Sequence, residues 1–96
     1  MHPVLLVGAG KIGSAVARLL SATKDYDVLM IDVDQRSIDR VGEIPHVQAR
    51  AVDVMSPAQL KAAMAGRKSV LSAVSFAQNP TIARGALEYG LSYFDL

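Results

Sequence analysis

The amino-acid sequence predicts an α/β fold: a doubly wound parallel sheet of five strands, in the order 3-2-1-4-5, with helices on both faces. Three observations predict it. Short apolar runs alternate with helical patterns along all 96 residues, the connections are short, and a glycine-rich turn follows the first apolar run. Because crossovers between parallel strands are right-handed, this alternation leaves few possible strand orders.

The composition restricts the classes of protein to which the chain can belong. A hydrophobic fraction of 51% is too high for a disordered chain, and no apolar run reaches the roughly 18 residues of a membrane-spanning helix. The charges sum to +1 and are scattered, so we expect neither nucleic acid nor a membrane as a partner. The absence of cysteine excludes disulfides and thiolate chemistry, and we expect a cytoplasmic location.

The first half of the chain predicts two strands, each followed by a helix. Residues 4–7 and 28–31 are uninterrupted apolar runs, which are typical of strands buried on both faces of a parallel sheet. Between them, apolar residues recur at helical spacing, and a short polar helix is predicted at residues 35–41. The face of the first helix that we expect to be buried consists of Ile12, Val16, Leu19 and Leu20.

The third strand and the third helix follow in the same order. Polar residues interrupt the strand at residues 47–54, which indicates an edge of the sheet with one face in water. Ser56 starts a capping box with proline at the first helical position, and Gly66 is expected to end the helix. The buried face of this helix is predicted to hold Leu60 and Met64.

A fourth strand, a fourth helix and a fifth strand complete the pattern. Residues 70–74 form another apolar run, and residues 92–96 form a strand rich in aromatic residues. Asn79 is predicted to cap the helix between them, and Gly90 is predicted to end it. Its buried side is predicted to hold Ile82, Ala86 and Tyr89. The last strand should form an exposed edge, through which we expect homo-oligomers to be possible.

A glycine motif lies between the first strand and the first helix. The run matches G-x-G-x-x-G and consists of Gly8, Ala9, Gly10, Lys11, Ile12 and Gly13. Gly8 allows the tight turn, Gly10 lets a pyrophosphate approach the backbone, and Gly13 lets the helix pack closely on the strand. Free N–H groups around Lys11 and Ile12 would hold the phosphates. In this context the motif predicts a Rossmann-like dinucleotide-binding site.

An acidic residue at the end of the second strand supplies the second half of this signal. Asp32, followed by Val33, is placed to accept hydrogen bonds from both hydroxyls of the adenosine ribose. A 2′-phosphate would be repelled by Asp32 and by Asp34, and Arg36 would compensate only in part. We therefore expect NAD as the cofactor, with NADP as the less favoured alternative.

Two further turns are expected at the same site, because ligands bind at the carboxyl ends of the strands in such sheets. Asp53 and Val54 are predicted to end the third strand, and they either line an adenine pocket or only shape the turn. Ala73, Val74 and Ser75 are predicted to end the fourth strand, near the nicotinamide ribose or the pyrophosphate.

The sequence assigns no catalytic residue and no metal site. His2 and His46 have no partners at metal-ligand spacing, and we expect both side chains to face solvent. No nucleophile with its base, and no pair of carboxylates, can be placed around a reacting centre.

Taken together, four stretches resemble the N-terminal nucleotide-binding domain of the saccharopine dehydrogenase family. They are residues 4–20, 30–34, 52–66 and 69–96, and the last is the most specific because it contains Gly90, Tyr93 and Asp95. The resemblance implies that residues 1–96 are the NAD(P)-binding domain of an oxidoreductase acting on a C–N bond. It also implies a second, substrate-binding domain after this one, without which residues 1–96 would be inert.

Two residues depart from that family's pattern. Ser75 stands where members often have proline. Asp32 stands where NADP-dependent members usually have a small residue followed by arginine, and this departure supports NAD.

Two alternatives remain open. Regulatory NAD(H)-binding modules of the potassium-transport type share the glycine motif and the acidic residue. They commonly have Gly-Asp-Ala where this chain has Val52, Asp53 and Val54, which favours the enzyme. A flavin site also begins with this motif, and a yellow preparation would reveal it.

Overall fold

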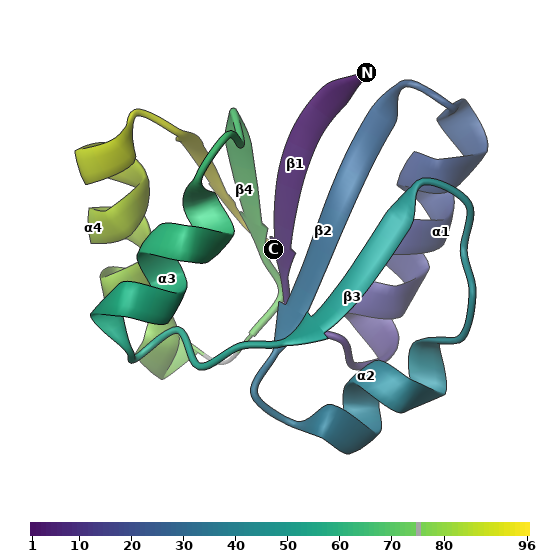
Figure 1. Ribbon diagram of the computed structural model, residues 1–96, viewed down its shortest axis with the longest axis horizontal. Helices are drawn as coiled ribbons and strands as arrows, with labels where there is room; N and C mark the ends of the chain where they lie inside the picture. Colours follow the sequence, from purple (N-terminus) through teal and green to yellow (C-terminus); the bar gives the residue numbers. More distant parts are fainter. Residues whose placement is uncertain (75) are drawn as a thin grey trace.

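The computed structural model describes residues 1–74 and 76–96, and it contains one five-stranded parallel sheet with helices on both faces (Figure 1). The elements in chain order are β1 (His2–Val7), α1 (Lys11–Thr23), β2 (Tyr26–Asp32), α2 (Gln35–Val41), β3 (Val47–Ala51), α3 (Pro57–Met64), β4 (Ser69–Ser72), the short 3-10 helix η1 (Phe76–Gln78), α4 (Asn79–Tyr89) and β5 (Ser92–Asp95). The strand order is β3-β2-β1-β4-β5, and every pairing between these strands is parallel. The predicted fold class and strand order are confirmed.

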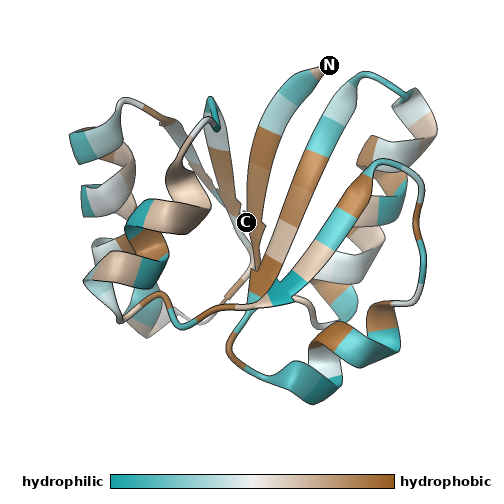
Figure 2. Cartoon of the chain, in the orientation of Figure 1, coloured by the Kyte–Doolittle hydropathy of each residue, from teal (hydrophilic) through white to brown (hydrophobic). Residues whose placement is uncertain are grey.

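The sheet separates two hydrophobic cores. Side chains alternate between the two faces along a strand, so Leu5 and Val7 of β1 pack toward α3 and α4, whereas Leu6 packs toward α1 and α2. Because both faces are covered, the central strands need apolar residues at successive positions. Figure 2 shows the result as a brown band through β1 and β2, whereas the helices carry both brown and teal positions.

Helix α1 buries only half of the predicted face, since Val16 and Leu20 pack against the core and Ile12 and Leu19 do not. Ile12 and Leu19 are 65% and 69% exposed, and the other two residues of the predicted face are only partly buried. The buried residues are Gly13, Ala17 and Ser21. Small side chains face the sheet because the helix lies close against the glycine turn, where a Cβ on Gly13 would collide with the carbonyl oxygen of Gly8. The apolar spacing therefore identified the helix and part of its contact face, but not the small residues at the centre of the contact.

Strands β3 and β4 are shorter than predicted. β3 ends at Ala51 and not at Val54, and β4 ends at Ser72 and not at Val74. The next residue of each strand still donates a backbone hydrogen bond to its neighbouring strand, of 2.9 and 2.8 Å, before the chain turns away. The candidate site residues of these segments therefore lie on turns just beyond the sheet.

Helix α3 begins at the predicted cap, but the capping box is only half formed. The Oγ of Ser56 accepts a hydrogen bond of 3.4 Å from the backbone N–H of Gln59. The Gln59 side chain does not return this bond to Ser56, because its Oε1 accepts the backbone N–H of Asp53 at 2.9 Å. The predicted buried pair, Leu60 and Met64, is confirmed.

Helix α4 begins differently from the prediction. The cap position belongs to Gln78, which makes no side-chain capping bond, and Asn79 is the first residue inside the helix. The Asn79 side chain is instead drawn inward, where it bonds to Ser72 and Asp95. The end of the helix agrees with the prediction, since Gly90 follows it with a left-handed φ of 75°.

The contact between α3 and α4 depends on a glycine that the sequence analysis did not single out. Ile82 and Ala86 are buried as predicted, but Tyr89 is 38% exposed, and Gly85 lies on the buried side in its place. A Cβ on Gly85 would lie 3.0 Å from a methyl carbon of Leu60, which is closer than ordinary packing distance. The absence of a side chain therefore lets the two helices approach each other.

The outer strands of the sheet are both exposed. β3 forms one edge, and its residues alternate between partly buried and exposed, as its polar residues predicted. β5 forms the other edge, where the side chains of Phe94 and Leu96 are 53% and 60% exposed. The prediction of an exposed edge at β5 is confirmed.

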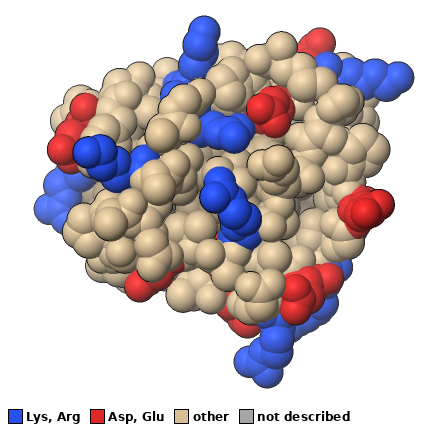
Figure 3. All heavy atoms as spheres, viewed as in Figure 1, with Lys and Arg blue, Asp and Glu red and all other residues tan. Residues whose placement is uncertain are grey.

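The molecular surface carries charges of both signs. Figure 3 shows Lys and Arg side chains interspersed with Asp and Glu over one face of the molecule. Within residues 1–74 and 76–96, no helix is long and apolar enough to cross a membrane. Nor do three or more His, Asp or Glu side chains gather within these ranges in a way that would hold a metal ion.

Candidate dinucleotide-binding site

A cleft of about 290 Å³ opens beyond the carboxyl ends of the parallel strands. Its lining residues are Val7, Gly8, Gly10, Asp32, Val33, Val52, Asp53, Val54, Ala73, Val74 and Gln78. The cleft lies beside the point where β1 pairs with both β2 and β4, which is where the strand order reverses and where ligands bind in open α/β sheets. Residues from all the predicted turns thus meet at one place.

The glycine turn between β1 and α1 is packed against the chain on two sides. Gly8 has a left-handed φ of 114°, and its N–H donates a hydrogen bond of 2.7 Å to the carbonyl oxygen of Ile31. A Cβ on Gly8 would lie 2.8 Å from the carbonyl oxygen of Ala73, so the chain just beyond β4 approaches here without room for a side chain. The first and third glycines of the motif therefore serve close packing within the chain.

The second glycine has the opposite environment. Gly10 lines the cleft, and a Cβ added there would meet no atom of the described chain within 4 Å. It is the N-cap of α1 and provides no side-chain capping bond, so the first N–H groups of the helix are not satisfied by a side chain of the cap. This open backbone at a helix start fits a pyrophosphate group. The side chains of Lys11 and Ile12 point elsewhere, since both are exposed and neither lines the cleft.

Asp32 lies at the end of β2, as predicted, and it faces the cleft. Its Oδ2 accepts the backbone N–H of Ala9 at 2.8 Å, and its Oδ1 accepts the backbone N–H of Asp34 at 2.9 Å. Ala9 itself is 5% exposed and does not line the cleft. The carboxylate is therefore engaged on both oxygens by the chain, which the sequence did not reveal.

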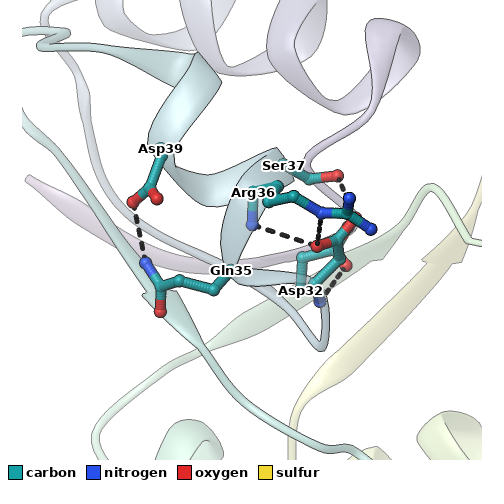
Figure 4. A network of polar contacts seen from close by, with 6 residues as sticks. Asp32, Gln35, Arg36, Ser37 and Asp39 are labelled. Carbon is teal, nitrogen blue, oxygen red and sulfur yellow. Dashed lines mark hydrogen bonds and ion pairs between the residues drawn. The ribbon is translucent and has the colours of Figure 1, made fainter.

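Asp34 is the N-cap of α2. Figure 4 shows the polar contacts at the start of this helix, around Asp32, Arg36 and Ser37. Its carboxylate accepts the backbone N–H of Arg36 at 3.0 Å and the hydroxyl of Ser37 at 3.3 Å. The Nε of Arg36 lies 3.7 Å from the same carboxylate, although the arginine side chain is 85% exposed. The hydrogen bond from the Arg36 backbone is the main reason why the pKa of Asp34 lies below its ordinary value. Arg36 is thus directed toward an acidic residue of its own helix.

The opposite wall of the cleft comes from the turns after β3 and β4. Asp53 and Val54 line it, and the Oδ1 of Asp53 also accepts the backbone N–H of Met55 at 2.9 Å. Asp53 therefore both shapes its turn and borders the cleft. Ala73 and Val74 line the other side, whereas Ser75 lies outside the residues that the structure describes.

A polar network beside this wall was not predicted. The hydroxyl of Ser72, which is fully buried, donates to the Oδ1 of Asn79 at 2.6 Å, and the Nδ2 of Asn79 donates to both carboxylate oxygens of Asp95 at 3.2 Å. We call these three residues the Asn79 network. It fixes the start of α4 to the ends of β4 and β5, and the adjacent Gln78 lines the cleft. The one available signal was Asn79, which the sequence indicated as a cap.

Tyr93 lies next to this network in β5. Its hydroxyl is buried and makes no hydrogen bond with any described residue. Burial raises the pKa of Tyr93, and the charge of Asp95 adds to the rise. Both effects favour the neutral phenol over the phenolate.

The two histidines lie at the amino ends of the strands, opposite the cleft. His2 begins β1, is exposed, and its Nε2 lies 3.0 Å from the hydroxyl of Ser69. His46 precedes β3 and is also exposed. Because both lie at the amino ends of their strands, neither belongs to the cleft.

Comparison with known proteins agrees with this geometry. The family model described as "Saccharopine dehydrogenase NADP binding domain" matches residues 4–96. Among solved structures, saccharopine dehydrogenase (L-Glu forming) from Saccharomyces cerevisiae is 21% identical, with a TM-score of 0.82 over 99% of this chain and 21% of that one. A Rossmann-fold NAD(P)-binding family protein from Shigella flexneri is 20% identical, with a TM-score of 0.80 over 97% of this chain and 50% of that one.

These structural likenesses establish the fold, and the family model establishes the kind of domain. The chain spans about a fifth of the length of the yeast enzyme and half the length of the Shigella protein. A short-chain dehydrogenase/reductase from Veillonella parvula, 14% identical, has the same fold, with a TM-score of 0.79 over 98% of this chain and 46% of that one. The chain belongs to the saccharopine dehydrogenase family and is an NAD(P)-binding Rossmann domain of that type.

Proposed function

We propose that the cleft binds NAD(H) across the glycine turn, with the adenosine half over β2 and β3. The open backbone at Gly10 and the start of α1 would hold the pyrophosphate. Asp32 would accept hydrogen bonds from the ribose hydroxyls, because each carboxylate oxygen keeps a lone pair after its bond to the backbone. The bound nicotinamide would supply hydride transfer.

The walls of the cleft then have distinct roles. Val33, Asp53 and Val54 would border the adenine, on the side where β2 and β3 end. Ala73 and Val74 would border the nicotinamide ribose, on the side where β4 ends. We assign Ser75 to that side from its place in the sequence alone.

The acidic surroundings of the ribose carry the proposal of NAD over NADP. Asp32 faces the cleft, and Asp34 follows it two positions later in the chain. A 2′-phosphate there would meet two carboxylates. Arg36 is directed toward Asp34, so a phosphate would have to compete for it.

We propose that the domain is the cofactor-binding part of an oxidoreductase acting on a C–N bond. Its family membership and the small share of the yeast enzyme that it spans support this proposal. A substrate domain elsewhere in the protein would provide the catalytic groups, so residues 1–96 alone would bind cofactor without turnover.

Calorimetric titration with NADH and NADPH at equal ionic strength tests the cofactor. We expect NADH to bind about tenfold more tightly, which corresponds to roughly 1.4 kcal/mol. Asp32→Ala should narrow this ratio, whereas Glu88→Gln, which removes one negative charge from the surface of α4, should leave it unchanged. Tighter binding of NADPH would contradict the preference, and binding of neither nucleotide would contradict the site.

A further inference from the structure

We propose that Asp32 is a positioning residue for the glycine turn, in addition to its role as a ribose ligand. Its carboxylate would hold the turn in the binding shape before any nucleotide arrives. This inference deepens the proposed function, and only its ribose half rests on that function. The positioning half rests on hydrogen bonds within the chain.

The carboxylate connects two turns that are far apart in sequence. One oxygen holds the N–H of Ala9, in the turn between β1 and α1. The other holds the N–H of Asp34, in the turn between β2 and α2. We call this arrangement the Asp32 bridge. It ties together the two backbone segments between which the adenosine ribose would lie.

The Ala9 donor depends on the bridge because it is buried. Two successive N–H groups of the turn are directed at β2: that of Gly8 reaches the carbonyl oxygen of Ile31, and that of Ala9 reaches Asp32. Ala9 is 5% exposed. Without the carboxylate its N–H would lose its partner in a place with little access to water, which folded structures avoid. The turn would therefore shift to find another acceptor.

The bridge leaves Asp32 able to bind a ribose. A carboxylate offers about four acceptor positions, and two backbone bonds occupy half of them. In an Asp32→Asn variant the side-chain amide has one acceptor oxygen and one donor nitrogen, so it cannot satisfy both N–H groups in the same way. Asparagine is therefore a nearly isosteric probe of the bridge itself.

Amide hydrogen exchange of the 96-residue chain without nucleotide tests the positioning role directly. We expect the Ala9 amide to be protected in the unmodified chain and to exchange about tenfold faster in Asp32→Asn and Asp32→Ala. Asp34→Asn is the matched control, because it removes one charge from the same turn and keeps the backbone donor. Its Ala9 amide should remain protected.

Binding of 2′,3′-dideoxyadenosine 5′-diphosphate separates positioning from ribose recognition, because this ligand has phosphates but no ribose hydroxyls. If Asp32 only bound hydroxyls, Asp32→Asn would leave its affinity unchanged or improve it by removing a negative charge. We expect Asp32→Asn to weaken it at least threefold, while Asp34→Asn does not weaken it.

The possible outcomes distinguish this inference from the proposed function. An unprotected Ala9 amide in the unmodified chain would overturn the inference, as would unchanged Ala9 exchange in both Asp32 variants. The Ala9 amide could be protected in the unmodified chain and exchange faster in both Asp32 variants, while the chain binds no adenine nucleotide. That result would support the positioning role and overturn the proposed function. Faster exchange of Ala9 in Asp34→Asn as well would mean that charge, and not the bridge, holds the turn.

Discussion

At the scale of single residues, the carboxylates around the cleft bind the chain's own backbone. Asp34 caps α2 and holds Arg36 near its own oxygen, at 3.7 Å. Capping needs only a side-chain oxygen, whereas holding an arginine needs the charge. The two roles of Asp34 can therefore be separated by substitution.

Asp34→Ser should raise the affinity for NADPH. Serine is a good N-cap, so α2 should remain intact, while Arg36 is released and one repelling charge is lost. We expect the NADH-to-NADPH affinity ratio to fall about threefold to tenfold in calorimetric titrations. In the double variant with Arg36→Ala, the part of the gain that comes from the arginine should disappear. An unchanged ratio in Asp34→Ser would show that this position does not influence cofactor choice.

Asn79→Ala should destabilise the domain. The substitution leaves the fully buried hydroxyl of Ser72 without its 2.6 Å partner and releases Asp95. An unpaired buried polar group costs about 1–3 kcal/mol, so the free energy of unfolding in urea should fall by this amount. Gln78→Ala is the control, because Gln78 makes no side-chain capping bond. Equal stabilities of the two variants would contradict the importance of the Asn79 network.

Some site residues are positioned by local sequence and could be predicted, whereas others are positioned by contacts between distant elements and could not. Asp32 and Gly10 follow from local sequence, because a glycine turn and a strand end have fixed roles in this kind of sheet. The Asn79 network depends on the register that places Ser72 beside Asp95 and on the rotation of α4. Neither quantity is visible in a single sequence, so the side chain of Asn79 was assigned to the wrong partner.

At the scale of secondary-structure elements, α1 shows why the helices were predicted better than their contact faces. The apolar spacing correctly indicated a helix, yet Ile12 and Leu19 are exposed. The short distance between α1 and the glycine turn decides which residues face the sheet. The helix starts directly against this turn, and only small residues fit there. The end of β3 also differs from the prediction: beyond Ala51 the N–H of Asp53 donates to the side chain of Gln59 in α3, a contact that the sequence alone does not reveal.

Gly13→Ala should lower the stability of the domain, whereas Gly10→Ala should weaken nucleotide binding and leave the stability nearly unchanged. A Cβ on Gly13 would collide with the Gly8 carbonyl, so we expect a loss of at least 1–3 kcal/mol, or a melting temperature lower by about 4–8 °C for each kcal/mol. A Cβ on Gly10 meets open space, so stability should change by less than about 0.5 kcal/mol while nucleotide binding weakens. Thermal melts and titrations of both variants check this pair. A stable Gly13→Ala variant would contradict the close packing.

At the scale of the whole molecule, the sheet has an apolar edge that no described element covers. Phe94 and Leu96 are more than half exposed, and β5 has only β4 as a neighbour. An uncovered strand with apolar side chains is suited to pairing with another strand. We propose that isolated 96-residue chains associate through β5.

Light scattering over a range of concentrations tests this association. We expect the mean mass to rise with concentration, and Phe94→Lys to keep the chain monomeric, because a charge on an edge strand opposes pairing. Leu87→Lys is the control, since it adds the same charge at an 83% exposed apolar position on α4 and not on the edge strand. A strict monomer at high concentration would contradict the proposal, and so would equal effects of the two lysines.

The central position of β1 has a consequence for the order in which the molecule can fold. β1 pairs with β2 through residues close in sequence, but its other neighbour is β4, where Val4 lies beside Ser69. During synthesis the first three strands can assemble early, while one side of β1 stays open until Ser69–Ser72 have been made. Closing that side joins distant segments, and such contacts form slowly. The wall of the cleft that β4 supplies is therefore expected to form last.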